Sequence, residues 1–151
     1  MIKIIQGDLL EAKENIIAHQ VNCKGVMGRG VAKQIKQKYN KAFNDYKNLI
    51  TRRAVEELLG RVQYVPIADK KYIANLFGQY KYGYDGIQYT NIEALSDCLF
   101  DLRKEAEKYE LSVALPYMIG SDRGGADRKE VEGLIIDAFE GYEVALYKLK
   151  R

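Results

Sequence analysis

The sequence predicts an α/β fold in which a largely parallel sheet carries helices on both faces. Three observations predict it: strand-length apolar runs alternate with amphipathic helix-length segments, no linker or internal repeat interrupts them, and two strand-to-helix junctions are rich in glycine. The 151 residues are the usual size of one domain, so we expect a single domain over residues 1–151. In such sheets, ligands bind at the carboxyl ends of the strands.

The strands are predicted, in chain order, from short apolar runs that are bounded by glycine, proline or charged residues. These runs lie at residues 2–6, 15–21, 61–67, 72–77, 111–116 and 143–149. Gly7 and Asp8 end the first run, and Ile16, Ile17 and Ala18 give the second the composition of a buried strand. A short turn at residues 68–70 is expected to join the third and fourth strands.

The helices are predicted from apolar residues that recur at a spacing of three or four. This pattern covers residues 31–39, 41–59, 90–109 and 128–139. The second helix is expected to break once near residues 50–53 and to end at Gly60, because glycine is a natural helix stop. The third is the clearest helix, and Thr90 followed by Glu93 has the pattern of a capping box.

Composition favours a cytoplasmic protein without a metal site. Cys23 and Cys98 have no second cysteine nearby, so we expect two reduced thiols, and the single histidine, His19, cannot build a zinc site of histidine and cysteine ligands. The amino-terminal apolar run is too short for a signal peptide or a membrane span. The net charge of +3 is a mild excess, and we interpret the lysines of residues 33–41 and 148–151 as solvated rather than as phosphate-binding, so nucleic acid is not an expected partner.

The first glycine-rich junction lies between the second strand and the first helix. It holds Gly25, Gly28 and Gly30, which allow positive φ angles and close approach of a ligand to the backbone. The following helix start offers free amide groups and the positive end of a dipole, which suit an anion such as a diphosphate. Val31 and Ala32 stand where a Walker A loop has Lys-Ser/Thr, and the glycine spacing is not that of a Rossmann fingerprint. The alternative is that these glycines serve only turns and helix packing.

The second junction, residues 115–127, repeats the order of strand, small residues and helix start. It contains Gly120, Gly124 and Gly125. Two such junctions in one small domain favour a ligand-binding role for both, because each offers backbone amides at the end of a strand. We therefore expect the two loops to clamp a diphosphate from two sides.

These junctions, in this order, resemble those of the macro domain family. The matching residues are Gly7-Asp8-Leu9 after the first strand, the loop from Asn22 to Gly30 and the segment from Pro116 to Asp127, so the resemblance covers essentially the whole length. The chain resembles the short, single-domain branch that includes ADP-ribose 1''-phosphate phosphatases and terminal ADP-ribose-protein glycohydrolases, and the segment from His19 to Gly25 is especially like the phosphatases. The resemblance implies a three-layer α/β/α fold with a mixed, largely parallel central sheet, and ADP-ribose or ADP-ribose 1''-phosphate as ligand.

The resemblance also implies which residues bind that ligand. Asp8 is expected to accept a hydrogen bond from the adenine amino group, unless it is only a turn or helix-cap residue. Tyr147 is the aromatic candidate beside the adenine, unless it is an ordinary core residue. The expected ligand-binding residues are Asp8, Leu9, Asn22, Gly25, Val26, Met27, Gly28, Gly30, Val31, Ile119, Gly120, Ser121, Asp122, Arg123, Gly124, Gly125 and Tyr147.

Asp127 and His19 are the candidate catalytic residues. Asp127 corresponds to an aspartate that acts on the distal ribose in the glycohydrolase group, and Asp127 with Glu130 is equally a helix-start pattern. His19 is a candidate general acid or base for the phosphatase reaction, and the alternative is a strand histidine that the backbone satisfies. The glycohydrolase group also uses a nucleophilic lysine. Gln79 stands at that place here, with Lys81 two residues further on.

Two functions are compatible with these residues, and a third, a nucleic-acid-associated domain, is disfavoured by the modest charge unless binding with a steep salt dependence is found. The first is a hydrolase that acts on ADP-ribose 1''-phosphate or on an ADP-ribosyl ester, which His19 and Asp127 favour. The second is a reader module that binds ADP-ribose or an ADP-ribosylated protein without turnover, which Gln79 favours. Residues 80–89, with four tyrosines, form either a flap over the distal ribose or an aromatic hairpin. No cofactor is expected for either function.

Overall fold

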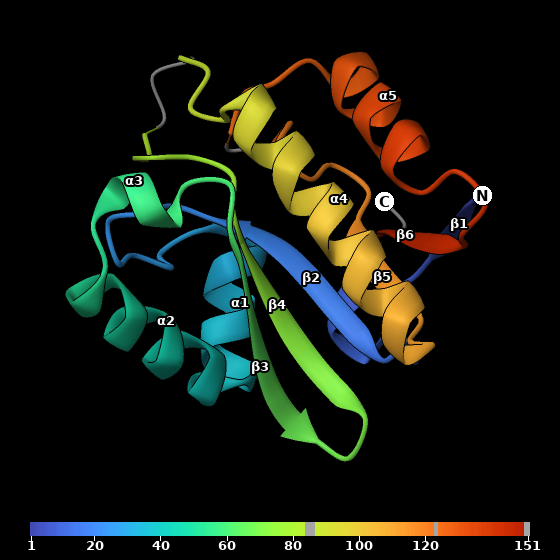
Figure 1. Ribbon diagram of the computed structural model, residues 1–151, viewed down its shortest axis with the longest axis horizontal. Coiled ribbons are helices and arrows are strands. Elements are labelled where there is room, and N and C mark those ends of the chain that lie inside the picture. The colour runs from blue at the N-terminus through green and yellow to red at the C-terminus, as the bar shows by residue number, and fades with distance from the viewer. Residues whose placement is uncertain (84–86, 123, 150–151) are drawn as a thin grey trace.

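The computed structural model describes residues 1–83, 87–122 and 124–149 (Figure 1). Strands and helices alternate along the chain, as the apolar pattern predicts. The elements, in order, are β1 (Ile2–Gln6), η1 (Leu9–Glu11, a 3₁₀ turn), β2 (Ile16–Val21), α1 (Gly30–Lys38), α2 (Asn40–Arg52), α3 (Val55–Leu58), β3 (Val62–Ala68), β4 (Lys71–Phe77), α4 (Ile92–Tyr109), β5 (Val113–Pro116), α5 (Arg128–Ala138) and β6 (Val144–Lys148).

The strands form one six-stranded sheet with the order β1-β6-β5-β2-β4-β3. Every neighbouring pair is parallel except β3 and β4, which confirms the mixed, largely parallel sheet. Because five strands run in one direction, their carboxyl ends lie along one edge of the sheet. Those ends are Gln6, Val21, Phe77, Pro116 and Lys148. The segments that follow them are the ones in which the sequence predicts the ligand-binding residues.

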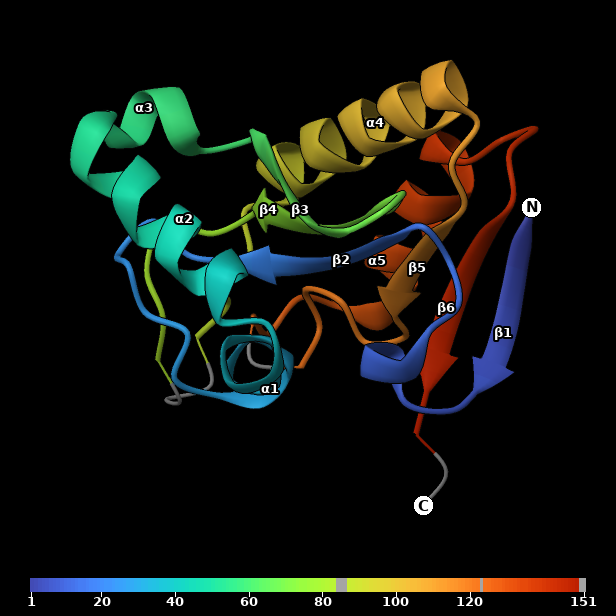
Figure 2. The same cartoon turned by 90° about the horizontal axis from the view of Figure 1, so that it is seen from below.

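Helices cover both faces of the sheet, which confirms the three-layer α/β/α architecture. On one face, α4 and α5 share a large apolar cluster with alternate residues of the central strands. On the other face, Ile35 of α1 and Ala42 of α2 pack on Ile17 and Ile73. Figure 2 shows α4 and α1 on opposite sides of the sheet. The central strands β2 and β4 are buried on both faces, which explains why they are nearly continuous apolar runs.

The helix boundaries follow the predicted pattern, with one correction at the start of α4. The break expected near residues 50–53 falls between α2 and α3. The predicted capping box at Thr90 is wrong, because Asn91 is the N-cap and its Oδ1 accepts a hydrogen bond from the amide of Ala94 at 2.9 Å. The Thr90 hydroxyl instead donates to the carbonyl of Gly120 at 2.7 Å, in the second glycine-rich segment.

Neither the thiols nor the helices of the described residues point to a disulfide or a membrane span. Cys23 and Cys98 are free, buried thiols, and burial raises the pKa of Cys23 to about 11. Within residues 1–83, 87–122 and 124–149, no helix combines the length and the apolar character that crossing a membrane requires. The same part of the chain gathers no group of three histidine, cysteine or acidic side chains that could hold a metal ion.

Candidate ligand-binding groove

Three hollows lie in series along the edge of the sheet where the parallel strands end. The outer hollow, about 710 Å³, is bounded by the ends of β1, β5 and β6. The middle hollow, about 110 Å³, and the inner hollow, about 90 Å³, lie between the loops that follow β2, β4 and β5. The outer and middle hollows share Val31, Pro116 and Met118. The middle and inner hollows share Gln20, Arg29, Ala32 and Gln79, so the three form one groove.

The outer hollow brings together Asp8, Leu9 and Tyr147. Asp8 caps η1, since its Oδ1 accepts a hydrogen bond from the Leu10 amide at 2.9 Å, and its side chain is exposed to the hollow. Tyr147 donates its hydroxyl to Oε1 of Glu14 at 2.6 Å. Burial, together with this hydrogen bond, raises the pKa of Tyr147 to about 12, so the side chain is neutral. The two alternatives for Asp8, cap residue and ligand acceptor, are therefore compatible.

The first glycine loop, residues 23–30, is held in place by a side chain that sequence reasoning missed. Tyr46 of α2 is fully buried, and its hydroxyl accepts the amides of Gly25 and Val26 at 3.1 Å each. The same hydroxyl lies 2.7 Å from the carbonyl oxygen of Asn22 and 2.8 Å from its Oδ1, either of which accepts its proton. Burial raises the pKa of Tyr46 above its usual range, so the hydroxyl keeps that proton. No motif in the sequence points to Tyr46, which reads as one more apolar position of an amphipathic helix.

The backbone amides that remain available to a ligand are therefore those at the start of α1, and not those of Gly25 and Val26, which the sequence also predicts as ligand-binding. The Val26 amide faces Tyr46, whereas the amides at the start of α1, including those of Gly30 and Val31, have no partner within the helix. Gly25 and Gly30 have φ angles of +82° and +57°, which favour glycine. The Met27 side chain is buried in the core, 1% exposed, so only its backbone can contact a ligand.

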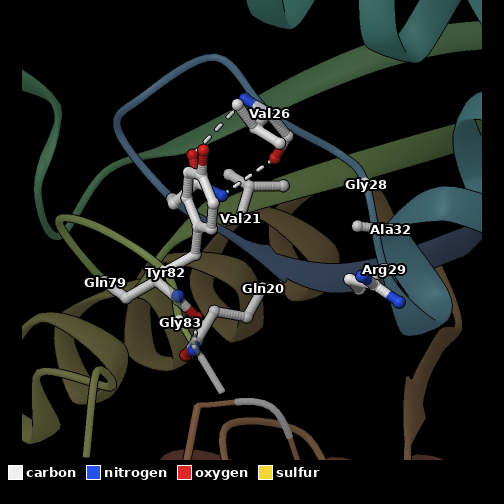
Figure 3. Close-up of a pocket in the computed structure, with 10 residues that line it drawn as sticks. Gln20, Val21, Val26, Gly28, Arg29, Ala32, Gln79, Tyr82 and Gly83 are labelled. Atoms are coloured by element: carbon white, nitrogen blue, oxygen red, sulfur yellow. Dashed lines mark hydrogen bonds between the residues drawn. The ribbon is translucent and has the colours of Figure 1, made fainter. Parts of the chain in front are cut away.

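Asn22 is fixed with its amide at the wall of the inner hollow. Its Nδ2 donates to the Val26 carbonyl at 2.8 Å, and its Oδ1 accepts from the Lys24 amide at 2.9 Å. The oxygen of this side-chain amide thus points toward α2, and one of its two N–H bonds is taken by the Val26 carbonyl. The second N–H bond is left to donate to a ligand in the inner hollow, which Asn22 lines. Figure 3 shows Arg29 on one side of this hollow and Gln79 and Tyr82 on the other.

The second glycine loop, residues 117–126, forms the facing wall of the middle hollow. Ile119, Gly120, Asp122 and Gly124 line it. Gly124 has no room for a side chain, because a Cβ there would overlap the Thr90 hydroxyl and lie 2.7 Å from the Gly120 carbonyl. Gly120 and Gly125 have φ angles of +72° and +73°. Ser121 and Gly125 are not among the lining residues, and Arg123 lies outside the described residues.

A polar network that the sequence did not predict joins the two loops. Nε2 of Gln20 donates to Oε1 of Gln79 at 2.6 Å and to the Thr90 hydroxyl at 2.8 Å, and Thr90 in turn donates to the Gly120 carbonyl. Nε2 of Gln79 donates to the Lys81 carbonyl at 2.7 Å. Gln79, which the resemblance places at the position of the glycohydrolase lysine, is thus held by both ends of its amide.

The segment from residue 80 to residue 89 is joined to the fold at its base. A single bridge pairs Gln79 with Thr90, and the amides of Tyr89 and Thr90 donate to the Gly124 carbonyl at 2.7 and 3.0 Å. Tyr82 and Gly83 line the inner hollow. Residues 84–86, the middle of the predicted flap or hairpin, lie outside the described residues. Of the described residues in this segment, Tyr82 and Gly83 therefore border the inner hollow.

His19 lies beneath the middle hollow, where it is 1% exposed. Its Nε2 is 2.6 Å from Oδ1 of Asn75, whose Nδ2 donates to Gln63 and to the Ala42 carbonyl. Since Asn75 presents its oxygen, Nε2 carries the proton and Nδ1 is the unprotonated nitrogen, without a partner among the described residues. Burial lowers the pKa of His19 to about 4, so the ring is neutral near pH 7. So low a pKa makes the ring a poor general acid near pH 7 and also a weak base at Nδ1, which is buried.

Asp127 lies apart from His19. It occupies the N-cap position of α5, yet its side chain makes no capping hydrogen bond, so the predicted capping pattern with Glu130 is not formed. Asp127 is exposed and does not line any of the three hollows, whereas Asp122 lines the middle one. The structure therefore brings Asp122, rather than Asp127, beside the floor that His19 forms.

Comparison with known proteins finds a consistent set of similar chains. A family model described as Macro domain matches residues 18–135. The DNA ADP-ribosyl glycohydrolase of Thermus aquaticus is 30% identical over 155 residues, which cover 98% of this chain and 41% of that protein. The ADP-ribose 1''-phosphate phosphatase of Aspergillus oryzae is 50% identical over 46 residues, 30% of this chain and 23% of that one. The solved macrodomain of Thermus aquaticus DarG superposes with a TM-score of 0.80 at 29% identity, covering 98% of both chains.

The matched proteins differ from this chain in length. The chain spans about two fifths of the length of the curated glycohydrolases that it matches over nearly its whole extent.

Proposed function

The chain belongs to the macro domain family, and we propose that it binds ADP-ribose in its groove and hydrolyses the bond at C1'' of the distal ribose. The observation that carries this is the order of the three hollows, which matches the order of the parts of ADP-ribose. A wide outer hollow suits adenine, a middle hollow between two amide-rich loops suits diphosphate, and a small amide-lined inner hollow suits a ribose. The names of the similar proteins support hydrolysis.

Each part of the ligand meets a defined set of groups in this proposal. In the outer hollow, the free carboxylate oxygen of Asp8 accepts from the adenine amino group, and the Tyr147 ring packs beside the base. In the middle hollow, the amides at the start of α1 and those of the second glycine loop surround the diphosphate. In the inner hollow, the side-chain amides of Asn22 and Gln79 face the distal ribose.

The chemical step needs a water molecule that attacks C1'' and a proton for the leaving group. The described lining of the inner hollow supplies amides, the Tyr82 side chain and the Arg29 guanidinium, but no acid, histidine or lysine. Positioning of water and ribose by Asn22 and Gln79 is therefore the main contribution of this part of the groove. Asp127 and His19 stay our catalytic candidates on the strength of the resemblance. Asp127 stands at the start of α5, outside the described lining of the three hollows, and the low pKa of His19 makes its Nδ1 a weak base, so the substitutions below test both roles.

A reader module is the second candidate function. One observation favours it: Gln79, at the place of the nucleophilic lysine, is held by hydrogen bonds at both ends of its amide and cannot form a covalent bond to the ribose. In a reader, the same groove would bind ADP-ribose, or an ADP-ribosylated protein, without turnover. We also propose a cytoplasmic location, where ADP-ribosylated targets and reduced thiols occur together.

Binding is tested by calorimetric titration of ADP-ribose into the wild-type protein and into Asp8→Asn. Asparagine keeps one oxygen for the Leu10 amide but replaces the second by an amino group, so the cap survives and the adenine loses its acceptor. A hydrogen bond to a charged group is worth about 1.5–3 kcal/mol, so affinity should fall at least roughly tenfold. Asp137→Asn, an exposed substitution on α5, is the matched control. Absence of any heat with the wild-type protein at millimolar ADP-ribose would disprove the proposed ligand.

Turnover is tested on three substrates that share the ADP-ribosyl group. They are ADP-ribose 1''-phosphate, an ADP-ribosyl ester on a protein and an ADP-ribosylated DNA strand. Release of phosphate, of free ADP-ribose from the protein or of free ADP-ribose from DNA identifies the leaving group. Tight binding of ADP-ribose without turnover of any substrate would establish the reader instead. If Asp127→Ala and His19→Ala both keep wild-type rates, the two catalytic assignments are wrong.

A further inference from the structure

A second concave region lies at the edge of the sheet opposite the groove, where β2, β4, β5 and β6 begin. One hollow, about 490 Å³, is bounded by the starts of β2 and β4 and by the end of α4. Another, about 530 Å³, is bounded by the starts of β5 and β6. The two share Glu110 and Leu111, so they form one cleft, which we call the far cleft. None of its described lining residues belongs to the lining of the groove.

Three tyrosines line the first hollow of the far cleft. Tyr64 of β3 and Tyr72 of β4 lie on the same face of the sheet, against the apolar cluster that α4 covers. Tyr109, which is 59% exposed, follows Glu105 at a spacing of four, so both stand on one side of α4. Nζ of Lys108 lies 5.2 Å from the ring centroid of Tyr109, so this ring is within reach of an alkylammonium group. Tyrosine rings attract such groups within about 6 Å, and the lining therefore favours a cation.

The charge of the far cleft favours a cation as well. Glu105 and Glu110 line the first hollow, where Lys70 is the one basic residue among those described. The second hollow adds three more glutamates: Glu14, Glu107 and Glu143. No lysine or arginine stands in the described lining of that second hollow. The far cleft is thus negative in a chain whose net charge is +3, and it is complementary to a positively charged ligand.

Some of these carboxylates are already engaged within the protein. Oε1 of Glu107 lies 3.1 Å from Nε of Arg103, and Oε1 of Glu14 accepts the Tyr147 hydroxyl at 2.6 Å. The remaining glutamates of the cleft form no salt bridge with any residue that the structure describes: Glu105, Glu110 and Glu143. Each hollow therefore keeps carboxylate charge that a ligand can neutralise.

The lining points to an organic cation rather than to a metal ion. Within residues 1–83, 87–122 and 124–149, no three histidine, cysteine or acidic side chains are grouped so that they could hold a metal ion. Leu111 belongs to both hollows, so an apolar side chain lies where the tyrosine-lined and glutamate-lined parts meet. A bare metal ion gains nothing from an apolar or aromatic wall, whereas methylene groups are stabilised there.

We propose that the far cleft binds a linear polyamine, an aliphatic chain that carries several ammonium groups. One ammonium group would lie among the tyrosines of the first hollow, the methylene chain against Leu111, and another ammonium group among the glutamates of the second hollow. Each hollow has a volume in the range of small-molecule sites, about 300–1,000 Å³. The proposal does not depend on the proposed function, because the far cleft and the groove lie at opposite edges of the sheet.

The test is calorimetric titration of spermidine into the wild-type protein and into variants of each wall. Tyr109→Leu should weaken binding about two- to fivefold, the contribution of one exposed cation–π contact, whereas Tyr109→Phe keeps the ring and should bind as the wild type does. Glu105→Gln with Glu143→Gln removes one carboxylate from each hollow and should weaken binding about three- to tenfold. The matched control is Glu56→Gln with Glu130→Gln, which removes the same charge from exposed positions outside the cleft and should leave affinity unchanged.

Three results would overturn the assignment. The first is equal affinity for spermidine in the wild type, in Tyr109→Leu and in the double variant of the cleft. The second is displacement of spermidine by magnesium ion at equal charge, with no effect of Tyr109→Leu, because the cleft would then be a plain acidic surface. The third is tighter binding of tetralysine than of spermidine, weakened by the same variants, which would assign the cleft to a basic protein segment.

Two further measurements keep the test separate from folding and from the groove. Thermal unfolding shows whether each variant is folded, and if the double variant is not, the comparison of Tyr109→Leu with Tyr109→Phe decides the outcome alone. ADP-ribose titrated into the same samples should bind all variants equally. Binding of spermidine without binding of ADP-ribose overturns only the proposed function, and the reverse overturns only the far cleft.

Discussion

Removal of one hydroxyl group, in Tyr46→Phe, should weaken ADP-ribose binding although Tyr46 cannot touch the ligand. The substitution keeps the buried ring, which stacks on Phe77 with centroids 5.8 Å apart, and deletes only the oxygen. The Gly25 amide then loses its acceptor, and the Val26 amide keeps only Oδ1 of Asn22, at 3.5 Å. A buried donor without a partner costs about 1–3 kcal/mol, so we expect a loss of roughly 2 kcal/mol in the free energy of unfolding.

For a chain of this size, that loss lowers Tm by about 4–8 °C. The distinctive expectation is for affinity: because the first glycine loop and the Asn22 amide lose their brace, the dissociation constant for ADP-ribose should rise about tenfold, or about 1.4 kcal/mol. Thermal unfolding measures the first quantity, and calorimetric titration well below Tm measures the second.

Tyr142→Phe is the matched control for this loss of a hydroxyl. The Tyr142 hydroxyl donates to the Ala106 and Leu111 carbonyls, at the end of α4 and away from the groove. This variant should lose stability while its affinity for ADP-ribose stays at the wild-type value. Equal dissociation constants for the two variants would refute the reasoning, because Tyr46 would then contribute to stability only.

The pKa of His19, the only histidine, is lowered to about 4 in the folded protein, so the stability that the neutral ring contributes is complete above pH 6.5 and is lost as pH falls toward 4. Denaturant titrations should show a loss of roughly 3 kcal/mol in the free energy of unfolding over this range for the wild type and no such loss for His19→Gln. The same pH dependence in both proteins would contradict this assignment. Gly124→Ala forces a Cβ against Thr90 and should lower the free energy of unfolding by about 1–3 kcal/mol. Gly133→Ala, in open space on α5, should raise the free energy of unfolding by about 0.5–1 kcal/mol. Similar values for the two variants would argue against close packing at Gly124. Tyr147→Phe keeps the ring and should bind ADP-ribose as the wild type does, while Tyr147→Ala should bind about tenfold more weakly; equal affinities would remove the ring from the adenine site.

The fold was predictable because its signals are local. Each strand of the sheet is a short apolar run, and each long helix repeats apolar residues at three and four, so the elements are found within about two residues of their predicted ends. The start of α4 shows where this fails. Thr90 and Asn91 are both good capping residues, and the choice between them is made by the Gly120 carbonyl, which draws the Thr90 hydroxyl away from the helix.

In the candidate site, too, features marked by local sequence were predictable and features that depend on packing were not. The two glycine loops were predicted because glycine marks a backbone path directly in the sequence, and the hollows lie between them. Tyr46 and Gln20 were not predicted, because their roles depend on which segment packs against them. Asp122, which the sequence analysis includes among the expected ligand-binding residues, lines the middle hollow, whereas Asp127, the catalytic candidate, lines none of the three hollows. Which of two nearby acids faces the groove depends on the folded backbone and not on the residue type.

The network from Gln79 through Gln20 and Thr90 to Gly120 has a consequence for the kinetics of binding. These hydrogen bonds are made between the protein's own side chains and backbone, so the protein itself holds the two walls of the groove at their separation. A ligand that enters has few side chains to order, and the entropy loss on binding is correspondingly small. Association should therefore be a single step whose rate depends on diffusion and on attraction of the diphosphate, with differences between variants expressed mainly in the rate of dissociation.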